Sequence, residues 1–192
     1  VESIFGDIRD YEIMKSNMLA FKPEIIFHLA AQPLVRDSYL DPLETYSTNV
    51  LGTANVLQAA RSVDSCKAIV VVTSDKCYDN EELNRPFQEQ DPMGGHDPYS
   101  ASKGCAELVT QSFRKSYFQE SEVFLASARA GNVIGGGDWS KDRLIPDTVR
   151  AVQSGQKIQL RNPKATRPWQ HVLDPLSGYI KLAESLYKKT PD

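Results

Sequence analysis

Two short runs of apolar residues constrain the fold of this chain more than any other feature of its sequence. Residues 24–30 and 68–73 are nearly continuous in apolar side chains, a pattern typical of parallel strands that are buried on both faces. Between them, residues 42–63 place apolar side chains three and four positions apart, as on one face of a helix. This order of strand, helix and strand predicts a βαβ unit with a right-handed crossover.

The alternation of strands and helices continues to the end of the chain. Further strands are expected at residues 1–5 and 123–128, and further helices at residues 99–117, 144–153 and 174–187. The whole pattern predicts an α/β fold with a doubly wound parallel sheet. Ligands bind such sheets at the carboxyl ends of the strands. Residues 131–146 and 161–168, rich in Gly, Pro, Asp and Arg, are expected to form loops there.

Composition excludes several classes of protein. The 192 residues, 41% hydrophobic and 24% charged, fit one globular domain, and a net charge of −3 argues against nucleic acid as the main partner. No apolar run approaches the roughly 18 residues of a membrane span, so no membrane association is expected. The three cysteines form no C-x-x-C pair and the three histidines lack zinc spacing, so neither a disulfide framework nor a metal site is expected. A reducing compartment, the cytoplasm, fits this cysteine content.

The segment Y-S-A-S-K at residues 99–103 is the sharpest local signal for chemistry. Tyr99 and Lys103 are four positions apart, so on a helix they project from one face. A neighbouring ammonium favours the phenolate form of a tyrosine, which can then exchange a proton with a sugar or alcohol hydroxyl. Taken alone, such a pair is more often an ordinary part of an amphipathic helix.

A second polar cluster, T-S-D-K at residues 73–76, directly follows a buried candidate strand. This is where an α/β sheet places its site. The alternative interpretation is a turn or helix cap, because Thr, Ser and Asp side chains bind nearby backbone N–H groups. Considered alone, the cluster fits the structural interpretation better.

Together with H-L-A-A at 28–31, R-A-G-N-V-I-G-G-G-D-W at 129–139 and R-P-W-Q-H-V at 167–172, these motifs resemble the extended short-chain dehydrogenase/reductase family. Within it, the chain resembles the nucleotide-sugar 4,6-dehydratases, and most closely those that act on CDP-glucose in deoxysugar biosynthesis. The resemblance covers nearly the whole chain and implies a Rossmann-like sheet. It also implies tightly held NAD and a CDP-sugar substrate.

The resemblance implies the following roles. Tyr99 would take the proton of the sugar C4 hydroxyl while the C4 hydride passes to NAD, Lys103 would lower the pKa of the phenol and bind the nicotinamide ribose, and Ser74 would share the hydrogen bond to the C4 oxygen. Asp75 would protonate the leaving C6 hydroxyl as Lys76 or a neighbour removes the C5 proton. The related dTDP-glucose enzymes carry glutamate at the position of Lys76, which favours the CDP-sugar branch. Lys76 could instead pair with Asp75 or with a ligand phosphate.

The resemblance also implies binding residues. The expected NAD contacts are Asp7, Ile8, Leu29, Ala30, Ala31, Asn49, Thr73, Tyr99 and Lys103. The sugar nucleotide is expected to contact Asn132, with Arg143 and Arg167 as fork-shaped donors to its pyrophosphate. Either arginine could instead be a solvated surface residue. His28 is expected to be a hydrogen-bonded core histidine.

One family motif, the glycine-rich turn G-x-x-G-x-x-G after the first strand, is absent from the sequence. We therefore expect a chain truncated at both ends, with residues 1–140 forming an incomplete NAD-binding region and residues 141–192 part of the nucleotide-sugar region. Two alternatives remain: a nucleotide-sugar epimerase or reductase of the same superfamily, and a catalytically incompetent module for folding or dimerisation. The resemblance implies a homodimer through a four-helix interface made by residues 42–63 and 99–117.

Overall fold

The computed structural model describes residues 2–80 and 85–189 and is built around a parallel sheet. Its strands are β1 (Ile25–His28), β2 (Ala68–Val72) and β3 (Phe124–Ala128), in the order β1-β2-β3. The register pairs Ile26 with Ile69 and Ile69 with Leu125, all in parallel. The predicted strands at 24–30, 68–73 and 123–128 are therefore confirmed, and each is slightly shorter than expected.

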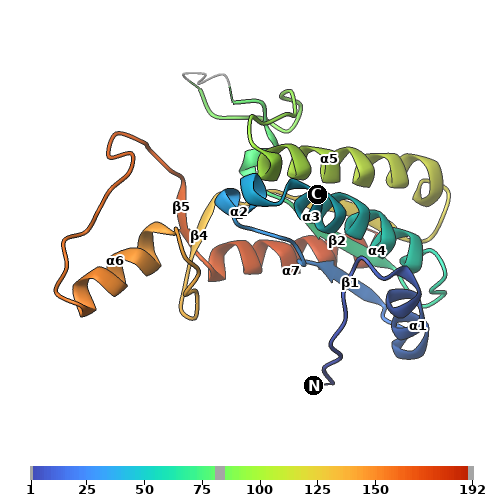
Figure 1. Ribbon diagram of the computed structural model, residues 1–192. Coiled ribbons are helices and arrows are strands. Elements are labelled where there is room, and N and C mark those ends of the chain that lie inside the picture. The colour runs from blue at the N-terminus through green and yellow to red at the C-terminus, as the bar shows by residue number, and fades with distance from the viewer. Residues whose placement is uncertain (1, 81–84, 190–192) are drawn as a thin grey trace.

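Helices cover both faces of this sheet, as predicted for a doubly wound fold. The predicted helix at 42–63 is a continuous helical stretch made of α3 (Pro42–Tyr46), the π-helical segment Ser47–Leu51 and α4 (Gly52–Ala60). It lies beside α5 (Pro98–Phe113), which continues into a second π-helical segment, Arg114–Phe118. On the other side of the sheet, α7 (Leu173–Tyr187) packs against β2 and β3 (Figure 1).

The hydrophobic core lies between β2 and α4. Ile69 and Val71 of β2 and Leu57 of α4 are at most 1% exposed and belong to one apolar cluster. Strand β1 differs, because Ile25 and Phe27 on its second face remain 37% and 40% exposed. That face of β1 lies beside the part of the sheet that α7 covers, so burial is complete from Ala68 to Val71 of β2 and partial at β1.

A second, two-stranded parallel sheet carries what we call the outer arm, residues 135–168. It pairs β4 (Asn132–Ile134) with β5 (Trp169–His171), and the arm between them contains α6 (Leu144–Gln153), at the bounds predicted for this helix. The strands approach so closely that a Cβ on Gly135 would lie 2.6 Å from Cγ1 of Val172. The expectation of a loop throughout residues 131–146 is therefore wrong at 132–134, which form a strand.

Three further elements differ from the sequence-based expectation. The helices α1 (Tyr11–Phe21) and α2 (Val35–Leu40) were not predicted, and α1 buries none of its residues completely, which weakens its periodic signal. The described part of the opening segment, residues 2–5, forms no strand, while Val1 lies outside the described residues. A strand needs a hydrogen-bonded neighbour, and β1 pairs only with β2 in the part of the chain that the structure describes.

No helix within residues 2–80 and 85–189 has the length and apolar character needed to cross a lipid bilayer. Over the same residues, no group of three or more His, Cys, Asp or Glu side chains is placed to hold a metal ion.

Candidate active site

The first turn of α5 places the tyrosine and the lysine. The Asp97 side chain caps the helix by accepting from the backbone N–H of Ser100 at 2.9 Å, and Pro98 occupies the first turn. Tyr99 and Lys103 then lie one turn apart on the same face, and they are only 8% and 6% exposed. The Lys103 Nζ atom is 6.0 Å from the centre of the Tyr99 ring.

Burial shifts the proton affinities of this pair in opposite directions. Burial raises the pKa of Tyr99, and a hydrogen bond with Ser74 and the positive charge of Arg143 partly offset that rise. Burial lowers the pKa of Lys103 to about 8, against the opposing effect of the Glu107 carboxylate. Because this pKa is still above neutrality, Lys103 remains mostly cationic at pH 7 beside a neutral phenol.

The turn after β2 brings Ser74 and Asp75 to the same place. The Ser74 hydroxyl accepts from the backbone N–H of Lys76 at 3.2 Å and donates to Asp75 Oδ1 at 3.1 Å, so it caps a short 3-10 turn, Asp75–Cys77. The structural interpretation of this cluster is thus confirmed. The same Ser74 also contacts the Tyr99 phenol, so the capping residue is in place to act in chemistry as well.

Lys76 is half-buried on this turn. No ion pair joins it to Asp75 within the described residues. The suggestion that Lys76 merely pairs with Asp75 therefore finds no support, and its amine remains available to a ligand.

A buried carboxylate, Glu107, was missed by the sequence analysis. It is 4% exposed and forms an ion pair with Arg129 at 2.9 Å. It also accepts hydrogen bonds from the hydroxyls of Thr73 and Ser127. The available signal was its spacing, since Glu107 follows Lys103 by four residues on a helical face.

The residues expected to contact NAD fall into two groups. At the end of β1, Leu29 and Ala30 are exposed and Ala31 is half-buried, so all three are available to a ligand. In contrast, Asn49 is 2% exposed, and its amide donates to the carbonyl of Gln32 at 3.1 Å and to the hydroxyl of Ser102 at 2.9 Å. Asn49 therefore joins the loop after β1 to α5, and its amide hydrogens are already used within the protein.

Three other members of the expected NAD set also have protein partners. The hydroxyl of Thr73 is bound to Glu107. Asp7 forms an exposed ion pair with Arg9 at 2.5 Å, and this hydrogen bond lowers the pKa of Asp7 to about 2. Ile8 packs so closely beside Gly52 that a Cβ there would lie 2.5 Å from its Cδ1.

The expected sugar-nucleotide residues lie on β4 and within the outer arm. Asn132 donates its backbone N–H to the carbonyl of Pro168 at 3.1 Å, which brings the segment of Arg167 alongside β4. The Asn132 Oδ1 atom is buried and has no hydrogen-bond partner within the described residues. Arg143 donates to Asp138 at 3.0 Å, and Arg167 is exposed.

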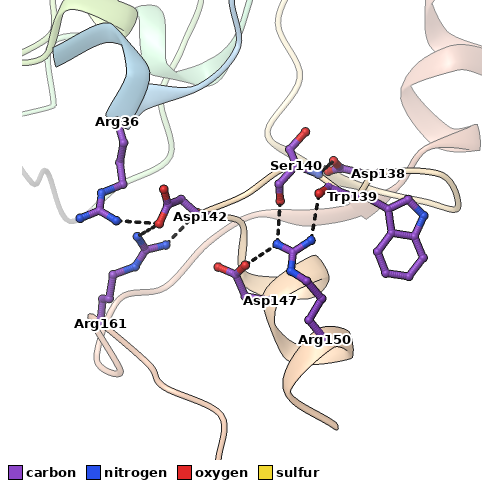
Figure 2. A network of polar contacts seen from close by, with 8 residues as sticks. All are labelled: Arg36, Asp138, Trp139, Ser140, Asp142, Asp147, Arg150 and Arg161. Atoms are coloured by element: carbon purple, nitrogen blue, oxygen red, sulfur yellow. Dashed lines mark hydrogen bonds and ion pairs between the residues drawn. The ribbon is translucent and has the colours of Figure 1, made fainter. Parts of the chain in front are cut away.

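The outer arm is tied to α2 and to itself by ion pairs (Figure 2). Asp142 accepts from Arg36 of α2 at 2.6 Å and from Arg161 at 2.9 Å. Farther along, Arg150 pairs with Asp147 at 2.5 Å and also donates to the carbonyls of Trp139 and Ser140, as Figure 2 shows. These contacts hold the loop that contains Arg143.

His28 is 5% exposed, and its Nε2 atom lies 2.9 Å from the Thr53 hydroxyl. Burial lowers its pKa to about 4, so it is neutral at pH 7. The prediction of a hydrogen-bonded core histidine is confirmed.

Comparison with known proteins identifies the family. A family model described as GDP-mannose 4,6 dehydratase matches residues 1–190. The chain belongs to this family. Over 97% of the chain, it is 58% identical to CDP-glucose 4,6-dehydratase from Salmonella typhimurium, covering 54% of that protein. It is also 27% identical to UDP-glucose 4-epimerase from Halalkalibacterium halodurans, over 95% of the chain and 58% of the epimerase.

Solved structures agree with this membership. The crystal structure of a dTDP-glucose 4,6-dehydratase from Streptomyces venezuelae, with NAD bound, superposes with a TM-score of 0.82 at 27% identity. The match covers 95% of this chain and 53% of that one. The predicted Rossmann-like α/β fold is thereby confirmed. The chain spans about half the length of the relatives it matches.

Proposed function

We propose that the protein is a CDP-glucose 4,6-dehydratase, a hydro-lyase that converts CDP-glucose to CDP-4-keto-6-deoxyglucose. The observation that carries the proposal is the meeting of Tyr99, Lys103, Ser74 and Asp75 at the carboxyl end of β2. The 58% identity to a relative of that activity supports the choice of substrate.

NAD is the cofactor that these residues fit. Lys103 is buried, and no hydrogen bond to its ammonium group is found in the part of the chain that the structure describes, so it is available to a ribose hydroxyl. The exposed Leu29 and Ala30 at the end of β1 leave room for a close approach. When bound, NAD would accept a hydride from C4 of the sugar and return it to C6 later in the cycle.

Side chains of the protein would carry out the proton transfers. Because burial raises its pKa, Tyr99 must first lose its own proton to solvent, and cationic Lys103 and the Ser74 hydrogen bond favour the resulting phenolate. As the phenolate, Tyr99 would accept the proton of the C4 hydroxyl. The 4-ketone so formed acidifies the C5–H bond. Asp75 would then protonate the departing C6 hydroxyl, and Lys76 is our candidate for the base at C5.

The CDP-sugar would lie between this centre and the outer arm. The unpartnered Oδ1 of Asn132 suits a hydroxyl or N–H donor of the ligand. Arg143, whose charge already reaches Tyr99, and Arg167 would bind the pyrophosphate. In this proposal residues 1–140 supply the cofactor side and residues 141–192 the nucleotide-sugar side.

We expect a second copy of the chain to bind the exposed face formed by α3, α4 and α5. Leu43 and Leu51 on the α3–α4 stretch and Leu108 on α5 are 79%, 62% and 56% exposed. These helices lie side by side, so together they offer an apolar surface for a four-helix dimer contact. A cytoplasmic location is also part of the proposal, because Cys66, Cys77 and Cys105 are all free thiols.

The test is incubation of the intact protein with CDP-glucose and NAD, followed by mass spectrometry of the nucleotide sugar. A product lighter by one water supports dehydration, and its absence contradicts it. An epimerase or reductase of the same superfamily is the alternative, favoured by the epimerase relative. Asp75→Asn separates the two, because epimerisation does not need an acid at C6 and would survive this substitution unchanged.

The remaining alternative is a module without catalysis. Titration of the 192-residue chain with NAD addresses it directly. Saturable binding would argue for a working cofactor site, whereas absence of binding together with a dimeric mass would favour the module.

A further inference from the structure

A buried carboxylate lies on the same helix as the proposed reacting groups but takes no part in the steps above. Glu107 and Lys103 are four residues apart on α5, so they share one face of the helix. They are 4% and 6% exposed. A buried carboxylate is costly unless it is paired and hydrogen-bonded, so the partners of Glu107 indicate what it holds together.

Those partners come from the ends of two neighbouring strands. The Thr73 hydroxyl, at the end of β2, donates to Oε1 of Glu107. From the end of β3, the Ser127 hydroxyl donates to Oε2 at 2.7 Å, and Arg129 donates at 3.0 and 2.9 Å. One carboxylate therefore fixes α5 to the carboxyl ends of both β2 and β3.

The link reaches the catalytic turn directly. Thr73 immediately precedes Ser74 and Asp75, and the backbone N–H groups of Thr73 and Asp75 donate to the carbonyls of Ala128 and Ala130 at 2.9 and 3.0 Å. The turn is thus paired with the extension of β3 through its backbone and with α5 through the Thr73 hydroxyl. Glu107 lies where these contacts converge.

The charge of Glu107 also acts on Lys103. Burial lowers the pKa of Lys103 to about 8, and Glu107 opposes this lowering. Arg129 is paired with the same carboxylate at 2.9 Å, and its charge of opposite sign offsets part of this effect. The other titratable or charged groups that face the Tyr99–Lys103 pair are an imidazole, a guanidinium and two carboxylates: His28, Arg143, Asp75 and Asp97.

We propose that Glu107 is a positioning residue of the active site. It holds the Thr73 turn against α5 and keeps Lys103 cationic, and Arg129 makes its buried charge tolerable. The proposal rests on the proposed function, because a cationic lysine matters only if Tyr99 transfers a proton.

The first measurement is independent of turnover. Lysine amines of the intact protein are isotope-labelled and titrated by NMR, and Lys103→Met assigns the Lys103 signal by its loss. In Glu107→Gln the pKa of Lys103 should fall, since the carboxylate that favours its cationic form is lost. Ser127→Ala is the matched control, because it removes one donor to Glu107 but keeps the carboxylate, and it should titrate as the wild type does. An unchanged Lys103 titration in Glu107→Gln would overturn the electrostatic role.

The second measurement is the pH dependence of CDP-glucose turnover. Glu107→Gln should move the alkaline limb of kcat to lower pH by the same amount, with little change in KM, because Lys103 loses its proton sooner. A purely structural role would lower the thermal midpoint and leave this limb in place, which would also overturn the proposal. If the wild type yields no dehydrated product, the proposed function fails. The NMR titration still tests whether Glu107 raises the pKa of Lys103.

A charge left unpaired on Arg129 could prevent Glu107→Gln from folding. The double variant Glu107→Gln with Arg129→Met removes both charges, which buried pairs tolerate better than the loss of one partner. The pKa of Lys103 is expected to fall there by less than in Glu107→Gln, because the positive charge of Arg129 is lost as well. A pKa at or above the wild-type value in the double variant would count against the proposal.

Discussion

The centre of the molecule and its outer arm use charged side chains in opposite ways. In the centre, the side chains of Glu107 and Arg129 are 4% and 15% exposed. In the arm, Asp142 pairs with Arg36 and Arg161, whose side chains are 64% and 53% exposed. Breaking a buried pair leaves an uncompensated charge and is strongly destabilising, whereas exposed pairs contribute at most about 1 kcal/mol and weaken in salt.

The difference in exposure suggests different roles for the two regions in the proposed reaction. The proposed proton-transferring groups lie beside a fixed frame, because the hydrogen bonds of Glu107 to Thr73 and Arg129 are buried. The arm, which carries Arg143 and Arg167, is held by contacts that water can replace. A fixed centre suits chemistry, and an adjustable arm suits the entry of a large nucleotide sugar.

The largest effect is expected at the centre. Tyr99→Phe removes the phenolic hydroxyl but keeps the ring, so kcat for CDP-glucose should fall by about 10²–10⁴-fold, the usual contribution of a positioned acid or base. Initial rates measured on the intact protein provide the test. Tyr117→Phe, at a ring that is 47% exposed far along the same helical stretch, is the control and should keep full activity. If Tyr99→Phe retained most of the wild-type kcat, Tyr99 would not be the group that transfers the proton.

Packing should show the same contrast between the two regions. Leu57, in the core, is 0% exposed, and Leu160, in the arm, is 55% exposed. Leu57→Ala should lower the free energy of unfolding by about 2–5 kcal/mol because it leaves a cavity. Leu160→Ala should change it by no more than about 0.5 kcal/mol. Urea unfolding of both variants measures these changes. Equal decreases in the free energy of unfolding would mean that the arm is packed as firmly as the core.

The fold was largely predictable because its strands and main helices each bury a regular apolar pattern. Residues 68–73 read directly as a strand since β2 is covered on both faces. The misses follow the same logic. Helix α1 buries no residue fully, and β4 is a short strand of half-buried residues whose partner lies more than thirty positions later in the sequence.

Site residues that lie close together in the sequence could be predicted from their spacing. Those whose contacts come from distant parts of the sequence could not. Tyr99 and Lys103 are four positions apart, and Ser74 and Asp75 are adjacent, so short motifs carried them. Glu107 depends on Thr73 and Arg129, which approach it only in the folded chain. For the same reason, sequence could not tell that the Asn49 amide hydrogens are already used within the protein.

Lys103, in the centre, should contribute to the pH dependence of stability. Burial lowers the pKa of Lys103 from 10.5 to about 8 in the folded state. Between these values the unfolded chain holds more protons at this lysine than the folded one, so Lys103 contributes a rise in stability with pH, by about 3 kcal/mol at 1.36 kcal/mol per pKa unit. The buried thiols of Cys66 and Cys77, whose pKa values burial raises, contribute in the opposite direction above about pH 9. Urea unfolding from pH 8 upward, compared with Lys103→Met, isolates this contribution. If the two proteins show the same slope, Lys103 is not the group responsible.

The smallest effect is expected in the arm, at Asp142. Its backbone has a φ of 61°, a conformation that asparagine also adopts readily, so Asp142→Asn removes the charge without straining the chain. Both Arg36 and Arg161 lose their carboxylate partner (Figure 2). Because these pairs are exposed, the free energy of unfolding should fall by less than about 1 kcal/mol. This decrease should disappear near 1 M salt, where the Debye length is about 3 Å. We expect KM for CDP-glucose to rise modestly at low salt while kcat is unchanged, with Asp64→Asn, at an exposed site, as the control. A salt-independent loss, or a fall in kcat, would show that the arm is as fixed as the centre.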